Sequence, residues 1–248
     1  MQNETVWVVG ASSGIGRAVA KKLHQNGARV ILSARRVEEL EKLNTEMENT
    51  AIVCPVNVCD AKTITGALQE ISQKTDKVNR IMIFSAAYKP GKLQDMSLGD
   101  IENIVDTNVT GVLRIIHKSI PILTQQGGGE ILLCGSVAGY FGLPSSQPYS
   151  ATKSAIINLA ESLAYDLQKQ NIRVRIINPG FVKTAMTDQN NFDMPCMITA
   201  EKAADEIIRG LNKNSFEIRF PKVFTCIMKT ISLLPYYLQK IIVKRIVR

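Results

Sequence analysis

The sequence TVWVVGASSGIGRAVA, residues 5–20, joins a short apolar run to a helical pattern through a turn that contains three glycines. Glycines at such a turn permit a tight bend, let backbone N–H groups approach a pyrophosphate and bring the helix close to the sheet. The N-terminus of the helix adds partial positive charge at the same place. Because the turn follows the first strand of a βα unit, it favours a dinucleotide site over an ordinary loop. The residues expected to contact the dinucleotide are Gly10, Ser12, Ser13, Gly14, Ile15 and Gly16.

Outward from this turn, short apolar runs alternate with helical patterns along most of the chain. Runs that are apolar on both faces are typical of strands in the middle of a parallel sheet covered by helices. Repeated alternation of strand and helix then predicts right-handed crossovers and a doubly wound parallel α/β sheet. The expected strands are residues 5–9, 29–33, 51–56, 80–84, 130–134 and 173–177.

The length of 248 residues suits one large α/β domain, and a composition with 45% hydrophobic and 21% charged residues excludes collagen-like, disordered and disulfide-scaffold proteins. We predict a dinucleotide-binding domain over residues 1–220 and a C-terminal extension over 221–248. No apolar run reaches the roughly 18 residues that span a bilayer, and the first residues do not resemble a secretory signal. Five cysteines without a C-x-x-C pair favour a reducing, cytoplasmic compartment. The two histidines have no neighbouring ligand residues, so no metal site is expected.

The second expected strand ends in LSARR, residues 32–36, without an acidic residue. A site selective for NAD usually has a carboxylate at this point that accepts the ribose 2′-hydroxyl, whereas arginines suit a 2′-phosphate. Arg35 and Arg36 therefore predict NADP(H) as the cofactor in preference to NAD(H). The alternative is that both arginines are solvated charges at the start of the next helix.

A possible reaction centre follows the fifth strand, in SVAG at residues 136–139 and YSATK at residues 149–153. Tyr149 and Lys153 are four residues apart on an expected helix, so they share a face. A neighbouring ammonium stabilises a phenolate and lowers the tyrosine pKa, which would make Tyr149 an acid–base group. Ser136 ends a central strand, where its hydroxyl could hold a carbonyl oxygen. Each residue alone could be structural, but the three together after a glycine turn indicate chemistry.

These motifs resemble the short-chain dehydrogenase/reductase family, in its compact single-domain branch, over roughly residues 4 to 220. The resemblance implies a Rossmann-like fold, a nicotinamide cofactor and the interconversion of carbonyls and alcohols. Its most specific parts are Gly10-x-x-x-Gly14-x-Gly16, Asn108 in TNVTG at residues 107–111, Ser136, Tyr149-x-x-x-Lys153 and Pro179-Gly180.

The resemblance also implies a role for each of these residues. Tyr149 would be the acid–base group, Lys153 would hold the nicotinamide ribose, and Ser136 would orient the substrate oxygen. Asn108 would help to anchor a water-linked proton relay. The further cofactor contacts implied are Asn57 and Val58 beside the adenine, Ala86 after the fourth strand, and Pro179, Gly180, Val182 and Thr184 around the nicotinamide.

Two segments depart from the family pattern. FSAA, residues 84–87, stands where the family commonly has Asn-Asn-Ala-Gly, so small residues remain but amides that steady the sheet are lost. Asn57 stands where the family commonly has an acidic residue beside the adenine. Neither change affects the reacting groups.

Residues 185–200 have the length and mixed character of a lid over the substrate. Apolar lids admit lipophilic ligands, so we expect a hydrophobic ketone, aldehyde or alcohol as the substrate. The alternative is that these apolar side chains pack in the core. The residues concerned are Met186, Phe192, Met194 and Met197 in the lid, with Tyr140, Phe141 and Phe181 near the motifs.

Positive charge is concentrated at the C-terminal end, where residues 216–248 carry +6 of the net charge of +8. A nucleic-acid-binding domain would spread that charge over one face, so no nucleic-acid partner is expected. Such a basic amphipathic extension could lie on an anionic membrane surface, cover the substrate cleft or contact a second subunit. An apolar stripe of Val223, Phe224, Ile227, Met228 and Ile231 precedes Leu234-Pro235, after which Leu238, Ile242, Val243, Ile246 and Val247 oppose Lys240, Lys244, Arg245 and Arg248.

The motifs together predict an NADP(H)-dependent oxidoreductase, and two other classes stay open. One is a non-catalytic dinucleotide-binding or membrane-associated interaction protein of the same fold, which would not need the intact set of Asn108, Ser136, Tyr149 and Lys153. The other is an isomerase or dehydratase on the same scaffold, which would not consume the cofactor. The family resemblance implies a homodimer or homotetramer.

Overall fold

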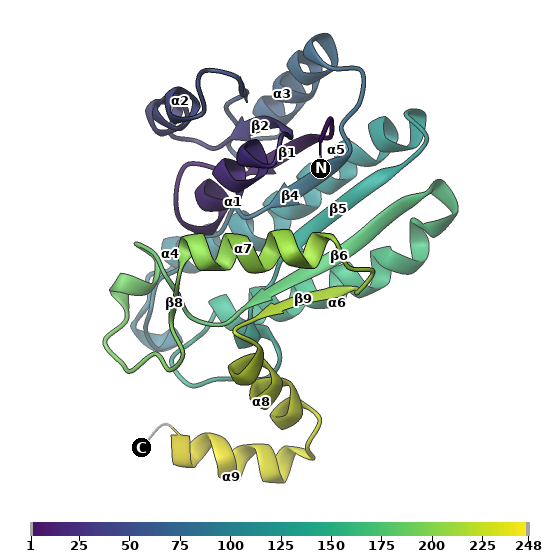
Figure 1. The fold of residues 1–248 in the computed structure, drawn as a ribbon. Coiled ribbons are helices and arrows are strands. Elements are labelled where there is room, and N and C mark those ends of the chain that lie inside the picture. The colour runs from purple at the N-terminus through teal and green to yellow at the C-terminus, as the bar shows by residue number, and fades with distance from the viewer. Residues whose placement is uncertain (1, 247–248) are drawn as a thin grey trace.

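Seven parallel strands form one sheet with helices on both faces in the computed structural model, which describes residues 2–246 (Figure 1). The strand order is β3-β2-β1-β4-β5-β6-β9, and every neighbouring pair is parallel. From β1 the chain builds outward to β3 on one side, and from β4 it builds outward to β9 on the other. The carboxyl ends of the strands around this reversal are where ligands bind in such sheets. The predicted doubly wound α/β fold is confirmed.

The strands of the sheet are β1 (Thr5–Val9), β2 (Arg29–Ser33), β3 (Ile52–Val53), β4 (Arg80–Ile83), β5 (Gly129–Cys134), β6 (Ile172–Pro179) and β9 (Glu217–Phe220). A separate parallel pair consists of β7 (Val182–Lys183) and β8 (Ile198–Thr199). The helices are α1 (Gly14–Gln25), α2 (Val37–Glu46), α3 (Ala61–Lys74), α4 (Leu98–Val105), α5 (Gly111–Gln125), α6 (Tyr149–Asp166), α7 (Ala200–Leu211), α8 (Lys222–Ser232) and α9 (Tyr236–Ile246).

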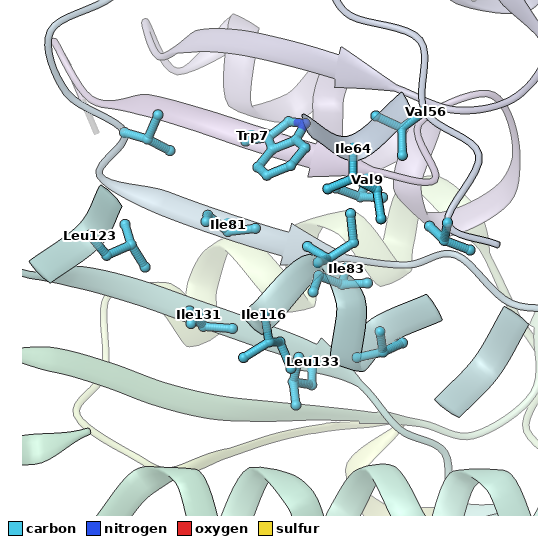
Figure 2. Close-up of a cluster of buried hydrophobic side chains, with 14 of the residues drawn as sticks. Trp7, Val9, Val56, Ile64, Ile81, Ile83, Ile116, Leu123, Ile131 and Leu133 are labelled. Atoms are coloured by element: carbon cyan, nitrogen blue, oxygen red, sulfur yellow. The ribbon is translucent and has the colours of Figure 1, made fainter. Parts of the chain in front are cut away.

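The core consists of two layers of side chains, one on each face of the sheet. Successive residues of a strand point to opposite faces, so Trp7 and Val9 pack against α3, α5 and α6 while Val6 and Val8 pack against α1, α2 and α7. Figure 2 shows Trp7 and Val9 in the first layer beside Ile64 from α3. Burial of both faces explains why the strands read as unbroken apolar runs.

Two strands of the seven-stranded sheet differ from the expectation, and the short pair of β7 and β8 was not predicted. The strand predicted for residues 51–56 is regular only over Ile52–Val53, because it is the edge strand and Pro55 has no N–H to donate. Cys54 N still donates to the Leu32 carbonyl of β2 at 2.9 Å, and Val56 N donates to the Ala34 carbonyl just after β2 at 3.1 Å. Strand β9 was not predicted at all. Its alternation of half-buried Glu217 and Arg219 with buried residues is too short to stand out.

The C-terminal extension forms two helices, α8 and α9, on either side of the expected break at Leu234-Pro235. Figure 1 shows them at the end of the molecule opposite α2 and α3. Of the helices in the described residues, none is long and apolar enough to cross a membrane. Val247 and Arg248, which the sequence places on the two arcs of the last helix, lie outside the described residues, as does the side chain of Ile246.

Candidate active site

A cleft of about 310 Å³ lies at the carboxyl ends of the central strands, where the strand order reverses. Every residue that the sequence assigned to a cofactor lines this cleft, and so does Ser136. Asn108 does not line it but lies directly behind it. The predicted cofactor residues in the wall are Gly10, Ser12, Ser13, Gly14, Ile15, Gly16, Arg35, Arg36, Asn57, Val58, Ala86, Tyr149, Lys153, Pro179, Gly180, Val182 and Thr184.

The glycine turn is shaped by two close approaches of the backbone. Gly10 has φ +93°, and a Cβ there would lie 2.6 Å from the backbone N of Ser85. A Cβ on Gly16 would lie 2.2 Å from the carbonyl oxygen of Gly10. Neither distance is possible for a side chain, so the strand–helix connection requires glycine at both positions.

The N-terminus of α1 meets the requirements of a phosphate site. The N-cap residue Ser13 makes no side-chain hydrogen bond to the helix, and the first turn contains no acidic residue. The first N–H groups of a helix have no partner within the helix and carry its positive dipole end. With Gly14 and Ile15 in the cleft wall, this donor set fits a pyrophosphate.

Two exposed arginines stand at the rim of the cleft after β2. Arg36 Nη2 donates to Ser12 Oγ at 3.2 Å, which ties it to the glycine turn. Neither Arg35 nor Arg36 forms an ion pair with another residue of the described chain. Both guanidinium groups therefore keep donors for an anion in the cleft.

The three reacting residues come together at the ends of β5 and α6. Tyr149 is the first residue of α6, and Lys153 lies one turn later, with Nζ 5.5 Å from the centroid of the Tyr149 ring. Lys153 is buried, with 3% of its surface exposed, and Nζ donates to the Cys134 carbonyl at 2.8 Å. Ser136 follows β5 and begins a 3₁₀ turn in which its Oγ accepts from Ala138 N at 3.1 Å.

The pKa of Tyr149 differs from the expectation. Burial raises the pKa of the phenol above its ordinary value, the neighbouring Cys134 adds to this, and a hydrogen bond with Ser136 lowers it only in part. Burial also lowers the pKa of Lys153, so the ammonium that should stabilise a phenolate is itself disfavoured. The expected lowering of the Tyr149 pKa by Lys153 was therefore wrong for this geometry. Tyr149 keeps its proton at neutral pH and can donate it.

Asn108 lies in a π-helical turn between α4 and α5 and binds the segment after β4. Its Oδ1 accepts from Ala87 N at 2.6 Å, and its Nδ2 donates to Ala87 O at 2.9 Å and to Thr152 Oγ1 at 3.1 Å. Asn108 thus holds the segment that lacks the usual family amides against α6, next to Lys153. Its part in a proton relay stays a prediction.

Several residues of the cleft wall were missed. Most adjoin predicted residues in the sequence, at strand ends that carry small side chains, so a wider window around each motif would have found them. Asn57 was assigned to the adenine, but its Oδ1 also accepts from Cys59 N at 3.2 Å and shapes the local turn. The missed wall residues are Ala34, Val56, Thr107, Cys134 and Gly135, whereas Phe84 and Ser85 belong to the FSAA segment and Ala185, Met186 and Thr187 to the predicted lid.

Aromatic side chains and the lid border the reacting end of the cleft. The ring of Tyr88 lies edge-on to Tyr149, with centroids 4.9 Å apart, and its hydroxyl donates to Asn190 Oδ1 of the lid at 2.6 Å. Phe181 contacts the lid residue Phe192, with ring centroids 6.0 Å apart. No residue from 185 to 197 is fully buried, so these lid residues are not part of the core.

Comparison with known proteins agrees with this geometry. A family model described as short chain dehydrogenase matches residues 4–195. An uncharacterized oxidoreductase of Myxococcus xanthus is 30% identical over 224 residues, which cover 89% of this chain and 88% of that protein. Dehydrogenase/reductase SDR family member 4 of Mus musculus is 30% identical over 218 residues, which cover 84% of this chain and 74% of that protein.

Solved structures share the fold at lower identity. Actinorhodin polyketide ketoreductase with NADPH has a TM-score of 0.80 at 21% identity and covers 89% of this chain and 97% of its own. A 3-ketoacyl-(acyl-carrier-protein) reductase from Brucella melitensis complexed with NADH has a TM-score of 0.80 at 21% identity, covering 89% and 98%. With the family match over most of its length, this chain belongs to the short-chain dehydrogenase/reductase family, whose members are oxidoreductases that act on CH–OH groups.

Proposed function

We propose that the protein is an NADP(H)-dependent oxidoreductase that interconverts a carbonyl and an alcohol on a lipophilic substrate, with Tyr149 as the acid–base group. The observation that carries this proposal is the environment of Lys153. Its buried Nζ has a carbonyl as partner and forms no ion pair with a described residue, although burial of an unpaired charge is costly. Strongly perturbed groups of this kind, at a cleft and beside Tyr149 and Ser136, are typical of reaction centres.

The preference for NADP(H) rests on Arg35 and Arg36, because similar solved structures hold NADPH, NADP+ or NADH and do not distinguish the two cofactors. The two guanidinium groups would bind the 2′-phosphate, and the N-terminus of α1 would bind the pyrophosphate. Lys153 would donate to the nicotinamide ribose, which gives this buried cation a polar partner. Val182 and Thr184 would flank the nicotinamide.

Each reacting residue then has a defined task. A bound nicotinamide cofactor would supply or accept the hydride. Ser136 Oγ donates a hydrogen bond to the substrate oxygen and holds it next to the Tyr149 hydroxyl. Tyr149 transfers its proton to that oxygen as negative charge develops there, and its raised pKa keeps the proton in place until then. The phenolate that then forms would supply the opposite charge that buried Lys153 lacks beforehand, so the two groups would stabilise each other at this stage of the reaction.

The substrate side supports a lipophilic compound. Met186 lines the cleft, and Phe181 and Phe192 adjoin it without being buried. The hydrogen bond between Tyr88 and Asn190 joins the loop after β4 to the lid across this region. A substrate that reaches Tyr149 would pass between these apolar and aromatic groups.

Assembly and location are further proposals. Val105 and Leu113 on the α4–α5 side are 40% and 42% exposed. Burial of these side chains against a second copy would remove apolar surface from water, which supports a homodimer or homotetramer. Free cysteines support a reducing, cytoplasmic compartment.

The test is a screen of lipophilic ketones and aldehydes in which NADPH oxidation is followed by absorbance. With a substrate in hand, Tyr149→Phe should bind NADPH normally and lose roughly 10²–10⁴-fold in turnover. Tyr165→Phe, an exposed tyrosine on the same helix, is the matched control and should be fully active. Undiminished turnover by Tyr149→Phe would refute the assigned acid, and product formed without NADPH consumption would favour the isomerase or dehydratase alternative.

A further inference from the structure

We propose that the exposed face of α8 and α9 docks onto the surface of an anionic lipid bilayer. This face, which we call the tail surface, consists of exposed side chains of residues 222–245. None of residues 236–245 is fully buried, and Figure 1 shows α9 as the outermost element beyond β9 and α8. Its apolar and aromatic members, 44–82% exposed, are Val223, Ile227, Leu233, Tyr236, Tyr237 and Ile241.

The charge of the tail surface has one sign. Residues 218–246 contain no Asp or Glu. Lys222, Lys240, Lys244 and Arg245 are exposed and form no ion pair within the described chain. Residues 1–215 carry a net charge of only +2, so the positive potential is local to this end of the molecule.

On α9, cations and apolar groups share one stripe. Tyr237, Lys240, Ile241 and Lys244 recur at the i, i+3, i+4 and i+7 positions, and all four are exposed. Gln239 on the other side anchors α9 to the end of α8, because its Nε2 donates to the carbonyls of Ser232 and Leu234 at 3.1 and 2.8 Å. The opposite arc that the sequence assigned to apolar contact is half-buried against the protein, at Leu238, Ile242 and Val243.

The apolar stripe predicted on α8 divides between two faces. Met228 and Ile231 are buried and hold the helix on the domain, whereas Val223 and Ile227 are 72% and 54% exposed. The exposed pair extends the apolar part of the tail surface, while Lys222 adds a cation beside it.

A lipid surface accounts for both the cations and the exposed apolar side chains of the tail surface. A nucleic acid or an acidic protein would attract the cations but would offer less to exposed Ile227, Leu233 and Ile241. At a bilayer surface the apolar side chains enter the acyl boundary, tyrosines lie at the headgroup level, and lysine stems reach back to anionic phosphates. The helices would lie on the bilayer and would not cross it.

Docking would also bring the substrate side near the lipid. Phe224 of α8 stacks on Phe181 with ring centroids 5.5 Å apart, and Phe181 contacts Phe192 of the lid. A lipophilic substrate dissolved in the bilayer would then be close to the lid. This consequence rests on the proposed function, whereas docking itself does not.

The experiment is co-sedimentation of the full chain with vesicles of phosphatidylcholine, alone or mixed with phosphatidylglycerol. We expect pelleting only with the anionic vesicles. A triple variant, Lys240→Glu, Lys244→Glu and Arg245→Glu, should bind at least about a hundredfold more weakly, since each lysine or arginine near such a surface contributes about fivefold. The matched control places the same charge change on other exposed lysines and should bind within a few-fold of wild type; it is Lys62→Glu, Lys77→Glu and Lys169→Glu.

A second pair of variants tests the apolar half of the surface. Tyr237→Ser with Ile241→Ser should reduce pelleting, whereas Leu93→Ser with Tyr165→Ser, at two positions elsewhere that are at least as exposed, should not. The proposal is overturned if wild-type protein does not pellet, if both charge triples lose affinity equally, or if the serine variants at Tyr237 and Ile241 have no effect.

It is also overturned if the tail variants only dissociate an oligomer in the absence of vesicles, because the tail surface would then bind a second copy. NADPH titration of the same variants keeps the two proposals separate. A protein that binds vesicles but no NADPH would contradict the proposed function alone.

Discussion

At the amino ends of β4 and β5, Glu130 forms ion pairs with three arginines. Its Oε2 lies 2.7 Å from Arg80 Nε, and its Oε1 lies 3.4 Å from Arg175 Nη1 and 3.6 Å from Arg173 Nε. Arg175 is fully buried, and its remaining donors reach the Ser215 and Gly210 carbonyls at 2.8 Å. At the carboxyl end of β5, Lys153 is also buried but has the Cys134 carbonyl in place of a carboxylate. At the amino ends of the strands, buried charges are therefore paired with opposite charges. At the carboxyl ends, the buried charge of Lys153 has no opposite charge as a partner.

The difference separates a structural role from a functional one. Burial of a charge is costly unless an opposite charge and hydrogen bonds offset it, and Glu130 with its arginines meets that condition. Lys153 does not, yet it lies beside the phenol of Tyr149 in a cleft that the N-terminus of α1 also lines. We infer that a bound ligand provides the polar partners that Lys153 lacks, whereas Glu130 and its arginines find all their partners within the chain.

The largest effect on stability is expected for Glu130, at the amino ends of the strands. Glu130→Gln leaves the fully buried Arg175 without its counter-charge, although Arg80 keeps its ion pair with Glu4, and this should lower the free energy of unfolding by about 3–5 kcal/mol. Urea denaturation measures this, with Glu161→Gln, an exposed carboxylate on α6, as a control that should unfold like wild type. If Glu130→Gln is as stable as the control, Glu130 does not balance buried charge as we infer.

A smaller effect is expected at the rim of the cleft. Arg35→Ala removes a charged hydrogen-bond donor worth about 1.5–3 kcal/mol, so NADPH affinity should fall roughly ten- to a hundredfold while NADH affinity stays the same. Arg29→Ala, at the amino end of the same strand, changes an exposed arginine far from the cleft and should leave both affinities unchanged. Equal losses for NADPH and NADH in Arg35→Ala would show that this residue does not select the cofactor.

The smallest change in stability is expected at Lys153. Lys153→Met removes a buried charge and one hydrogen bond, so the free energy of unfolding should change by less than about 1 kcal/mol near neutral pH, although turnover is lost. A loss as large as that of Glu130→Gln would mean that Lys153 is structural.

The pH dependence of stability gives a second measurement on Lys153→Met. Burial lowers the pKa of Lys153 in the folded state from 10.5, so the unfolded chain binds more protons between the lowered pKa and 10.5. The free energy of unfolding contributed by this group therefore rises with pH. In urea denaturation the stability of wild type should increase relative to that of Lys153→Met as the pH is raised toward 10.5. Parallel profiles for the two proteins would contradict the lowered pKa.

Features that are determined by residues close together in the sequence could be predicted from it. The glycine turn before α1 and the spacing of Tyr149 and Lys153 on α6 are local patterns, and the structure places them as expected. Contacts between distant segments could not be predicted in this way. Tyr88 and Asn190 are 102 positions apart and no motif links them. The pKa of Tyr149 was predicted in the wrong direction because the spacing to Lys153 does not report burial.

The most direct test of the account needs no substrate: titration of wild-type protein with NADPH and NADH in parallel, followed by fluorescence. We predict that NADPH binds, and that it binds about ten- to a hundredfold more tightly than NADH. The reason is that the guanidinium groups of Arg35 and Arg36, at the cleft rim, keep hydrogen-bond donors for the 2′-phosphate. Equal affinities would overturn the preference for NADP(H). Binding of neither nucleotide would contradict the central claim, that the unbalanced charge at the carboxyl edge of the sheet belongs to a dinucleotide site.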